Sequence, residues 1–156
     1  MSDASTTRRI LDTTQTIAVV GLSDKVHRPS YFVGKYLLDH GYTVIPVNPM
    51  VDEVLGQKSY ASLADIPVPV DMVDCFRRAD QMVELAEAAI SLNARVLWMQ
   101  LGVVNNEASD MAIAAGLEVV MDRCIKIEHA RVFGGLNWAG VNTGLISARR
   151  SKRINL

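Results

Sequence analysis

The chain has 156 residues, a length that suits a single domain with a sizeable core. Hydrophobic residues make up 49% and charged residues 21%, and the net charge is -1, so the composition is typical of a soluble globular protein and gives no sign of a nucleic-acid-binding surface. No stretch has the roughly 20 apolar residues that cross a bilayer, and the polar N-terminus lacks the apolar core of a signal peptide.

The two cysteines, Cys75 and Cys124, are far apart in the sequence and do not suggest a disulfide framework. A reducing cytoplasm is therefore the expected location. The three histidines and two cysteines show none of the close pairings of a zinc site, so no metal is expected.

Apolar runs alternate with helical patterns along the chain. After a short leading helix at 5–14, strands are predicted at 16–21, 42–49, 70–76, 95–102 and 118–124, and helices at 30–41, 79–94 and 105–117. Between the second and third strands, Pro67 and Pro69 leave room only for a helical turn at 60–64. This pattern predicts an α/β fold with a Rossmann-like, doubly wound parallel sheet of about five strands in the order 3-2-1-4-5.

The carboxyl ends of parallel strands meet at one edge of a sheet, where ligands of such folds bind. The loop after the first strand, GLSDKVHRPS, carries Gly21, Ser23, Lys25 and Arg28 and leads to a helix near Ser30. Hydroxyls, positive charges and a helix N-terminus favour a ligand with several negative charges. Each residue also has an ordinary structural role open to it: Ser30 as an N-cap, for example, or Arg77 as the ion-pair partner of Asp74 or Asp80.

The loop does not fit the usual site for NAD(P). Ser23 stands where the second glycine of the dinucleotide fingerprint would be, and Asn48 stands where an acidic residue would hold the ribose. A nucleotide sensor of the NAD(P) type is therefore one of the weaker alternatives.

Several separated segments, among them AVVGLSDKVHRPSYFVGKYLLDHGYTVIPVNP, VDMVDCFRRAD and LWMQLGVVNNEA, together resemble the small single-domain CoA-binding proteins. These proteins are related to the N-terminal CoA-binding domain of the succinyl-CoA synthetase α-subunit. The resemblance covers about residues 10–131 and implies a Rossmann-like fold that binds coenzyme A or an acyl-CoA, mainly through its nucleotide and phosphates.

The resemblance also implies where coenzyme A is held. The residues that match the family's binding segments are Gly21, Ser23, Lys25, Arg28 and Ser30; Val47, Asn48 and Pro49; Phe76 and Arg77; Gln100 and Gly102; and Cys124 toward the pantetheine end. The synthetase has a lysine after its second strand, where this chain has Asn48 and Pro49, so the positive charge must come from Lys25, Arg28 or Arg77. The synthetase's phosphorylated histidine belongs to a second domain that has no counterpart in these 156 residues, so synthetase catalysis is not implied.

The leading hypothesis is a protein that binds coenzyme A without catalysis. A second is an enzyme that acts on an acyl-CoA or a CoA disulfide, with Cys124 as the reactive thiol and His129 as its base; Cys124 as a small buried apolar residue is the simpler alternative. The extension at 132–156 is rich in glycine and ends in a basic run, Arg149, Arg150, Lys152 and Arg153. Two roles stay open for it: wrapping the surface, or contacting a partner chain, whether a second copy or another protein.

Overall fold

The computed structural model describes residues 3–134. The expectations for the C-terminal extension beyond residue 134, its basic run included, lie outside the described residues. None of the helices within the described range is long and apolar enough to cross a membrane.

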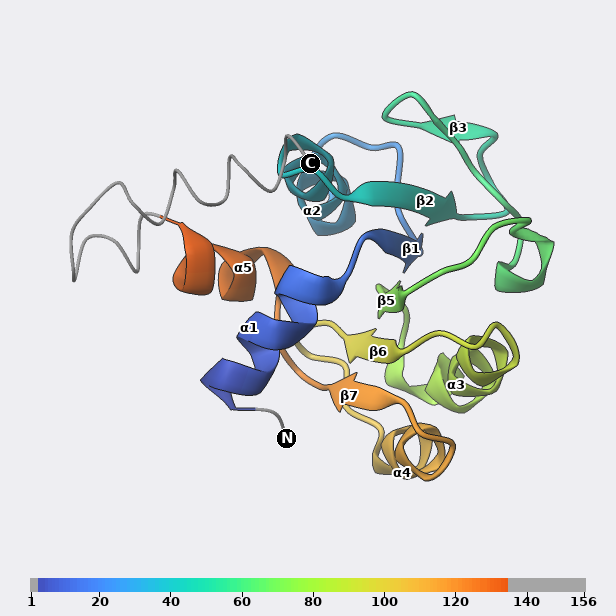
Figure 1. Ribbon diagram of the computed structural model, residues 1–156. Helices are drawn as coiled ribbons and strands as arrows, with labels where there is room; N and C mark the ends of the chain where they lie inside the picture. The colour runs from blue at the N-terminus through green and yellow to red at the C-terminus, as the bar shows by residue number, and fades with distance from the viewer. Residues whose placement is uncertain (1–2, 135–156) are drawn as a thin grey trace.

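A five-stranded parallel sheet forms the centre of the fold (Figure 1). Its strands are β1 (Thr16–Val20), β2 (Thr43–Val47), β5 (Met72–Cys75), β6 (Val96–Met99) and β7 (Glu118–Val120), in the order β2-β1-β5-β6-β7. Helices cover both faces, so the predicted α/β Rossmann-like class is confirmed.

The predicted strand order is wrong at one point. The strand predicted at 70–76, observed as β5, pairs with β1 over four residues rather than lying outside β2. The outer side of β2 is instead occupied by Tyr60, whose N–H donates to the carbonyl of Pro46 at 3.0 Å and whose carbonyl accepts from the N–H of Asn48 at 2.9 Å. Pro46 has no N–H to offer on that side, which limits the pairing there to one isolated bridge.

The helices form two layers, one on each face of the sheet (Figure 1). The first layer contains α1 (Ala4–Thr13), α2 (Pro29–Asp39) and α5 (Ile125–Phe133), and the second contains α3 (Met82–Ser91) and α4 (Asn106–Ala114). The short elements are a hairpin of β3 (Glu53–Val54) and β4 (Gln57–Lys58), and two 3-10 turns, η1 (Leu63–Asp65) and η2 (Ala79–Gln81).

Alternation along each strand divides the core between the two layers. In β1, Ile17 and Val19 belong to the cluster under α1, α2 and α5, whereas Ala18 and Val20 belong to the cluster under α3 and α4. The central strands β1, β5 and β6 are buried on both faces, whereas the edge strand β7 is only partly buried. Burial on both faces explains why the central strands appear in the sequence as largely apolar runs.

Side-chain caps explain where two of the helices begin, and one helix, α5, was missed by the sequence analysis. The side chains of Asp3 and Asn105 accept from backbone N–H groups in the first turns of α1 and α4 and so cap these helices. Helix α5 was not predicted, although Ile125, His129 and Phe133 recur at helical spacing and are buried. The glycine-rich sequence that follows concealed this pattern.

Candidate functional site

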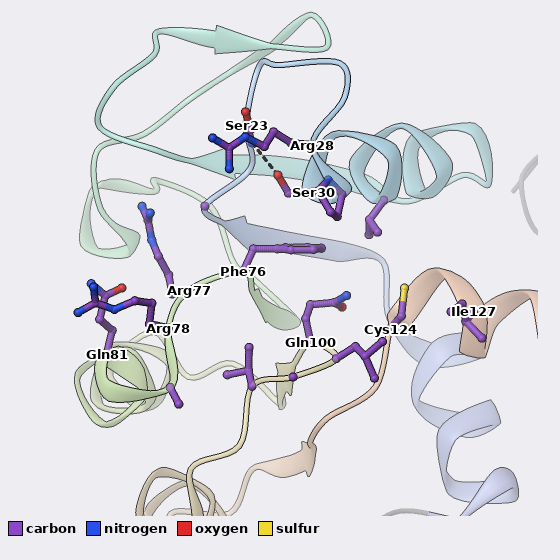
Figure 2. A pocket seen from close by; sticks show the side chains of 17 residues that line it. Ser23, Arg28, Ser30, Phe76, Arg77, Arg78, Gln81, Gln100, Cys124 and Ile127 are labelled. Atoms are coloured by element: carbon purple, nitrogen blue, oxygen red, sulfur yellow. Dashed lines mark hydrogen bonds between the residues drawn. The ribbon is translucent and has the colours of Figure 1, made fainter.

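The carboxyl ends of β1, β5 and β6 open onto a cavity of about 800 Å³. Such a volume lies within the range of sites for small molecules and cofactors. Nine predicted site residues line the cavity (Figure 2): Gly21, Ser23, Arg28, Ser30, Phe76, Arg77, Gln100, Gly102 and Cys124.

Gly21 brings the end of β1 against the end of β5. Its φ is +88°, and a Cβ atom at this position would lie 2.4 Å from the carbonyl oxygen of Phe76. Its N–H donates to the carbonyl of Val47 at 2.8 Å, which ties the same point to β2. Glycine is therefore required by a close backbone approach as well as by the positive φ.

Two serines hold the loop that follows Gly21. The backbone N–H of Ser23 donates to Oγ of Ser30 at 2.9 Å, and Oγ of Ser23 accepts from the N–H of Lys25 at 3.0 Å. Each hydroxyl oxygen thus serves as an acceptor within the protein, and each keeps its own O–H donor for a ligand. Ser30 is not the N-cap of α2: Arg28 occupies that position and Pro29 is the first helical residue, which suits its fixed φ.

The charged side chains that line the cavity are Arg28, Arg77 and Arg78, with no acidic residue among the lining residues. Arg78 forms an exposed ion pair with Asp80 at 2.9 Å. Within residues 3–134, the guanidinium groups of Arg28 and Arg77 have no hydrogen-bond or ion-pair partner. The sequence analysis offered Arg77 as the partner of Asp80; the structure assigns that pair to the neighbouring arginine. This end of the cavity is therefore suited to an anion.

The opposite end of the cavity is largely apolar. Figure 2 shows Phe76 and Gln100 in the middle, with Cys124 and Ile127 on the side away from Arg77. Gln100 is only 4% exposed, and its Oε1 accepts from the N–H of Ile125 at 3.2 Å, which holds the amide in place. Its amide nitrogen has no protein partner in the described part of the chain and points into the cavity.

Four predicted residues, Lys25, Val47, Asn48 and Pro49, do not line this cavity. Val47 is a core residue at the end of β2. The amide of Asn48 is used internally: Nδ2 donates to the carbonyl of Leu22 at 3.0 Å, and Oδ1 accepts from the N–H of Met50 at 2.9 Å. Asn48 therefore joins the loops that follow β1 and β2.

The sequence analysis also missed lining residues. These are Pro29, Val33, Arg78, Ala79, Gln81, Leu101, Val103 and Ile127. Most lie within three residues of a predicted one, so extending each strand-end segment by a few positions would have found them. Ile127 lies three residues after the predicted Cys124, on the helix α5 that the sequence analysis did not predict.

A second cavity of about 310 Å³ lies beside the first and shares Leu101, Cys124 and Ile127 with it. Its charged lining residues carry both signs: Asp122, Arg123, Glu128 and Arg131. Glu128 is largely buried and forms an ion pair with Arg131 at 2.6 Å. Cys124, at the N-cap of α5, therefore borders two cavities of different character.

Burial perturbs two other titratable groups near the strand ends. It raises the pKa of the Asp74 carboxyl well above its ordinary value, and neither carboxyl oxygen has a hydrogen-bond partner within residues 3–134. Burial, and then the neighbouring Asp74, raise the pKa of the Cys75 thiol. Neither residue lines the cavities described above.

Comparison with known families gives this geometry a context. Residues 15–130 match a family model described as a CoA binding domain. The chain belongs to the CoA-binding domain family. The resemblance recognised in the sequence is thereby confirmed.

This CoA-binding domain is similar to several known proteins. It is 47% identical over 123 residues to the protein YneT of Bacillus subtilis, a match that covers 79% of this chain and 91% of YneT. A protein of known structure from Pyrococcus horikoshii superimposes with a TM-score of 0.83 at 44% identity, over 85% of this chain and 94% of the other. A 60-residue segment is 38% identical to an ADP-forming acetate–CoA ligase of Archaeoglobus fulgidus and spans 37% of this chain but only 9% of the ligase.

Proposed function

We propose that this protein binds coenzyme A or an acyl-CoA in the main cavity and does not catalyse a reaction on it. The observation that carries the proposal is the asymmetry of the cavity in a member of the CoA-binding domain family. One end presents three arginines and no acid, and the other is apolar apart from one buried amide and one thiol. Coenzyme A has the same asymmetry, because its phosphates lie at one end and its uncharged pantetheine arm at the other.

In this proposal the phosphates lie at the arginine end. Arg28 and Arg77 supply charge that no described residue neutralises, and Ser23 and Ser30 supply hydroxyl donors. The N-terminus of α2 contributes the positive end of a helix dipole. Lys25, Val47, Asn48 and Pro49 remain proposed contacts of the nucleotide beyond the lining of the cavity.

The pantetheine arm then runs past Phe76 toward Cys124. Its amide groups need polar partners in an otherwise apolar channel, and the amide nitrogen of Gln100 offers a buried donor along this path (Figure 2). The cavity-lining residues include no histidine, aspartate, glutamate, lysine or tyrosine. A general acid or base for acyl transfer is thus missing from the lining, which favours binding without catalysis.

Calorimetric titration tests the proposal with coenzyme A, acetyl-CoA, ADP, pantetheine and NAD as ligands. We expect coenzyme A to bind more tightly than ADP or pantetheine, because it fills both ends of the cavity, and NAD to bind most weakly. No measurable heat with millimolar coenzyme A would reject the proposal. Release of free thiol from acetyl-CoA above the protein-free rate, followed with a thiol reagent, would reject the non-catalytic part alone.

Charge-matched variants locate the phosphates. Replacing Arg28 or Arg77 with alanine should weaken coenzyme A binding about 10- to 100-fold, because a hydrogen bond to a charged group contributes roughly 1.5–3 kcal/mol. Arg78→Ala should cost less, since Asp80 already occupies that guanidinium. Lys35→Ala is the control: it removes one positive charge from the same helix as Pro29, outside the cavity lining, and should leave the affinity unchanged.

A further inference from the structure

The position of Cys124 distinguishes it from the other cysteine of the chain. Its side chain is half-buried and lines the main cavity at the end away from Arg77 and Arg78 (Figure 2), and it lines the second cavity as well. Cys75 is fully buried inside the sheet and lines neither cavity. Only one of the two thiols can therefore be reached by a molecule in the main cavity.

Gln100 gives an independent indication that this end of the cavity is built for a ligand. The polar atoms of a side chain that is 96% buried mostly have hydrogen-bond partners in the protein or in ordered water. Here Oε1 is fixed by the N–H of Ile125, at the start of the helix that Cys124 caps, while the amide nitrogen points into the cavity without a partner among residues 3–134. A donor placed in this way is available to an acceptor on a ligand lying between Phe76 and Cys124.

We propose that Cys124 captures coenzyme A as a mixed disulfide, so that the cavity is a site of reversible covalent modification as well as of binding. This inference rests on the proposed function. With the phosphates held at the arginine end, the pantetheine arm brings its terminal sulfur toward the Cys124 thiol at the opposite end. The substrate class is the disulfide of coenzyme A.

The reaction is a thiol–disulfide exchange, which needs no other oxidant. Cys124 loses its proton, and its sulfur attacks the nearer sulfur of the CoA disulfide. A bond forms between Cys124 and that sulfur, the original S–S bond breaks, and the departing CoA thiolate takes up a proton. One mixed disulfide and one reduced coenzyme A result. An excess of reduced thiol reverses the exchange.

The second cavity helps to explain how a bulky disulfide can be accommodated. Because Cys124, Leu101 and Ile127 line both cavities, a group attached to the ligand's sulfur has space beyond the main cavity. A site that ended in a closed wall at Cys124 would admit only the free thiol form.

Intact-protein mass spectrometry tests the inference on the full, reduced chain. After incubation with CoA disulfide, the protein should gain the mass of one CoA moiety, and dithiothreitol should remove it. Peptide mapping should place the adduct on Cys124. The Cys75→Ser variant should still form one adduct, whereas Cys124→Ser should form none, with tryptophan fluorescence used to check that each variant is folded.

Two other disulfides separate binding-directed capture from ordinary thiol reactivity. Pantethine has the same arm and the same S–S bond but no nucleotide, and hydroxyethyl disulfide is small and uncharged. We expect CoA disulfide to react at least ~100-fold faster than hydroxyethyl disulfide, because prior binding replaces a chance encounter with a positioned one. Pantethine should be intermediate, and Arg77→Ala should slow CoA disulfide without slowing hydroxyethyl disulfide.

The outcomes distinguish this inference from the function on which it rests. If coenzyme A binds in calorimetry but Cys124 forms no adduct, or reacts equally fast with all three disulfides, covalent capture is refuted and the binding function stands. If coenzyme A does not bind, the proposed function fails. If, in that case, an adduct forms at equal rates from all three disulfides, Cys124 is only an accessible thiol, and directed capture is refuted as well.

Discussion

The close approach of Gly21 to Phe76 makes a quantitative prediction for the variant Gly21→Ala. A methyl group there would lie 2.4 Å from the carbonyl oxygen of Phe76. The N–H of Phe76 donates to the carbonyl of Val20 at 2.9 Å, which holds this part of the main chain in place. The oxygen is main chain rather than the end of a flexible side chain. The methyl group can therefore be accommodated only if the end of β5 moves away from β1.

Two terms contribute to the loss of stability. A positive φ costs a residue with a Cβ atom about 1–2 kcal/mol, and overpacking at a site that cannot relax costs about 1–3 kcal/mol. Together these terms predict a loss of about 2–5 kcal/mol, a large share of the roughly 5–15 kcal/mol that stabilises a typical domain. Coenzyme A affinity should also fall, because Gly21 and Phe76 both line the cavity.

Gly116→Ala is the matched control, because Gly116 has a φ of +96° but nothing within 4 Å of its added Cβ atom. It should lose only the backbone term of about 1–2 kcal/mol. Urea denaturation followed by tryptophan fluorescence measures both variants, provided that the slope m is unchanged. If Gly21→Ala is no less stable than Gly116→Ala, the contact with the Phe76 carbonyl does not destabilise the fold, and the prediction is refuted.

Two further predictions concern polar groups beneath and beside the cavity. Burial raises the pKa of Asp74 in the folded protein, so Asp74 ionises at lower pH in the unfolded chain than in the folded one. The free energy of unfolding therefore falls as pH rises above the ordinary carboxyl pKa, by up to about 1.4 kcal/mol per pH unit. The fall ends where pH reaches the raised pKa of the folded state. Asp74→Asn removes this pH-dependent loss. In urea titrations, the free energy of unfolding of the variant minus that of wild type should therefore increase between pH 4 and pH 7. If that difference stays constant with pH, Asp74 is not protonated in the folded state. Asn48→Ala removes one hydrogen bond that joins the loops after β1 and β2 and a second within the loop after β2. Thermal unfolding should show a loss of about 1–3 kcal/mol, whereas an unchanged Tm would mean that these bonds are replaced by water.

The sequence predicted the positions of the main strands and most helices because each buried strand is a continuous apolar run. It did not predict the strand order, because the residue that takes the outer position beside β2 is Tyr60, within a segment that has no strand pattern. Pairing of a single residue leaves no periodicity in a sequence. The order 3-2-1-4-5 followed the usual doubly wound arrangement, which places the run at 70–76 outside the second strand, while its actual partner is β1.

The candidate site was predicted best where it depends on backbone position. Gly21, Phe76 and Gln100 directly follow the ends of β1, β5 and β6, and Cys124 lies in the loop that leads from β7 to α5, so the parallel topology brings them together. The prediction was weaker where side-chain pairing decides. Adjacent arginines look alike in a sequence, and only the structure shows that Arg78 pairs with Asp80 while Arg77 faces the cavity without a described partner.

The single bridge at Tyr60 has a consequence for how the molecule meets other molecules. An open sheet edge exposes unpaired donors and acceptors that can recruit a strand from another chain. Here Pro46 leaves a gap in the row of donors along β2, and Tyr60 occupies the carbonyl of Pro46 and the N–H of Asn48, so a foreign strand finds no continuous ladder. The β2 edge is thus a poor template for growth of the sheet and for the aggregation that such growth starts, so within residues 3–134 self-association through the sheet would have to use the opposite edge, β7, which pairs only with β6.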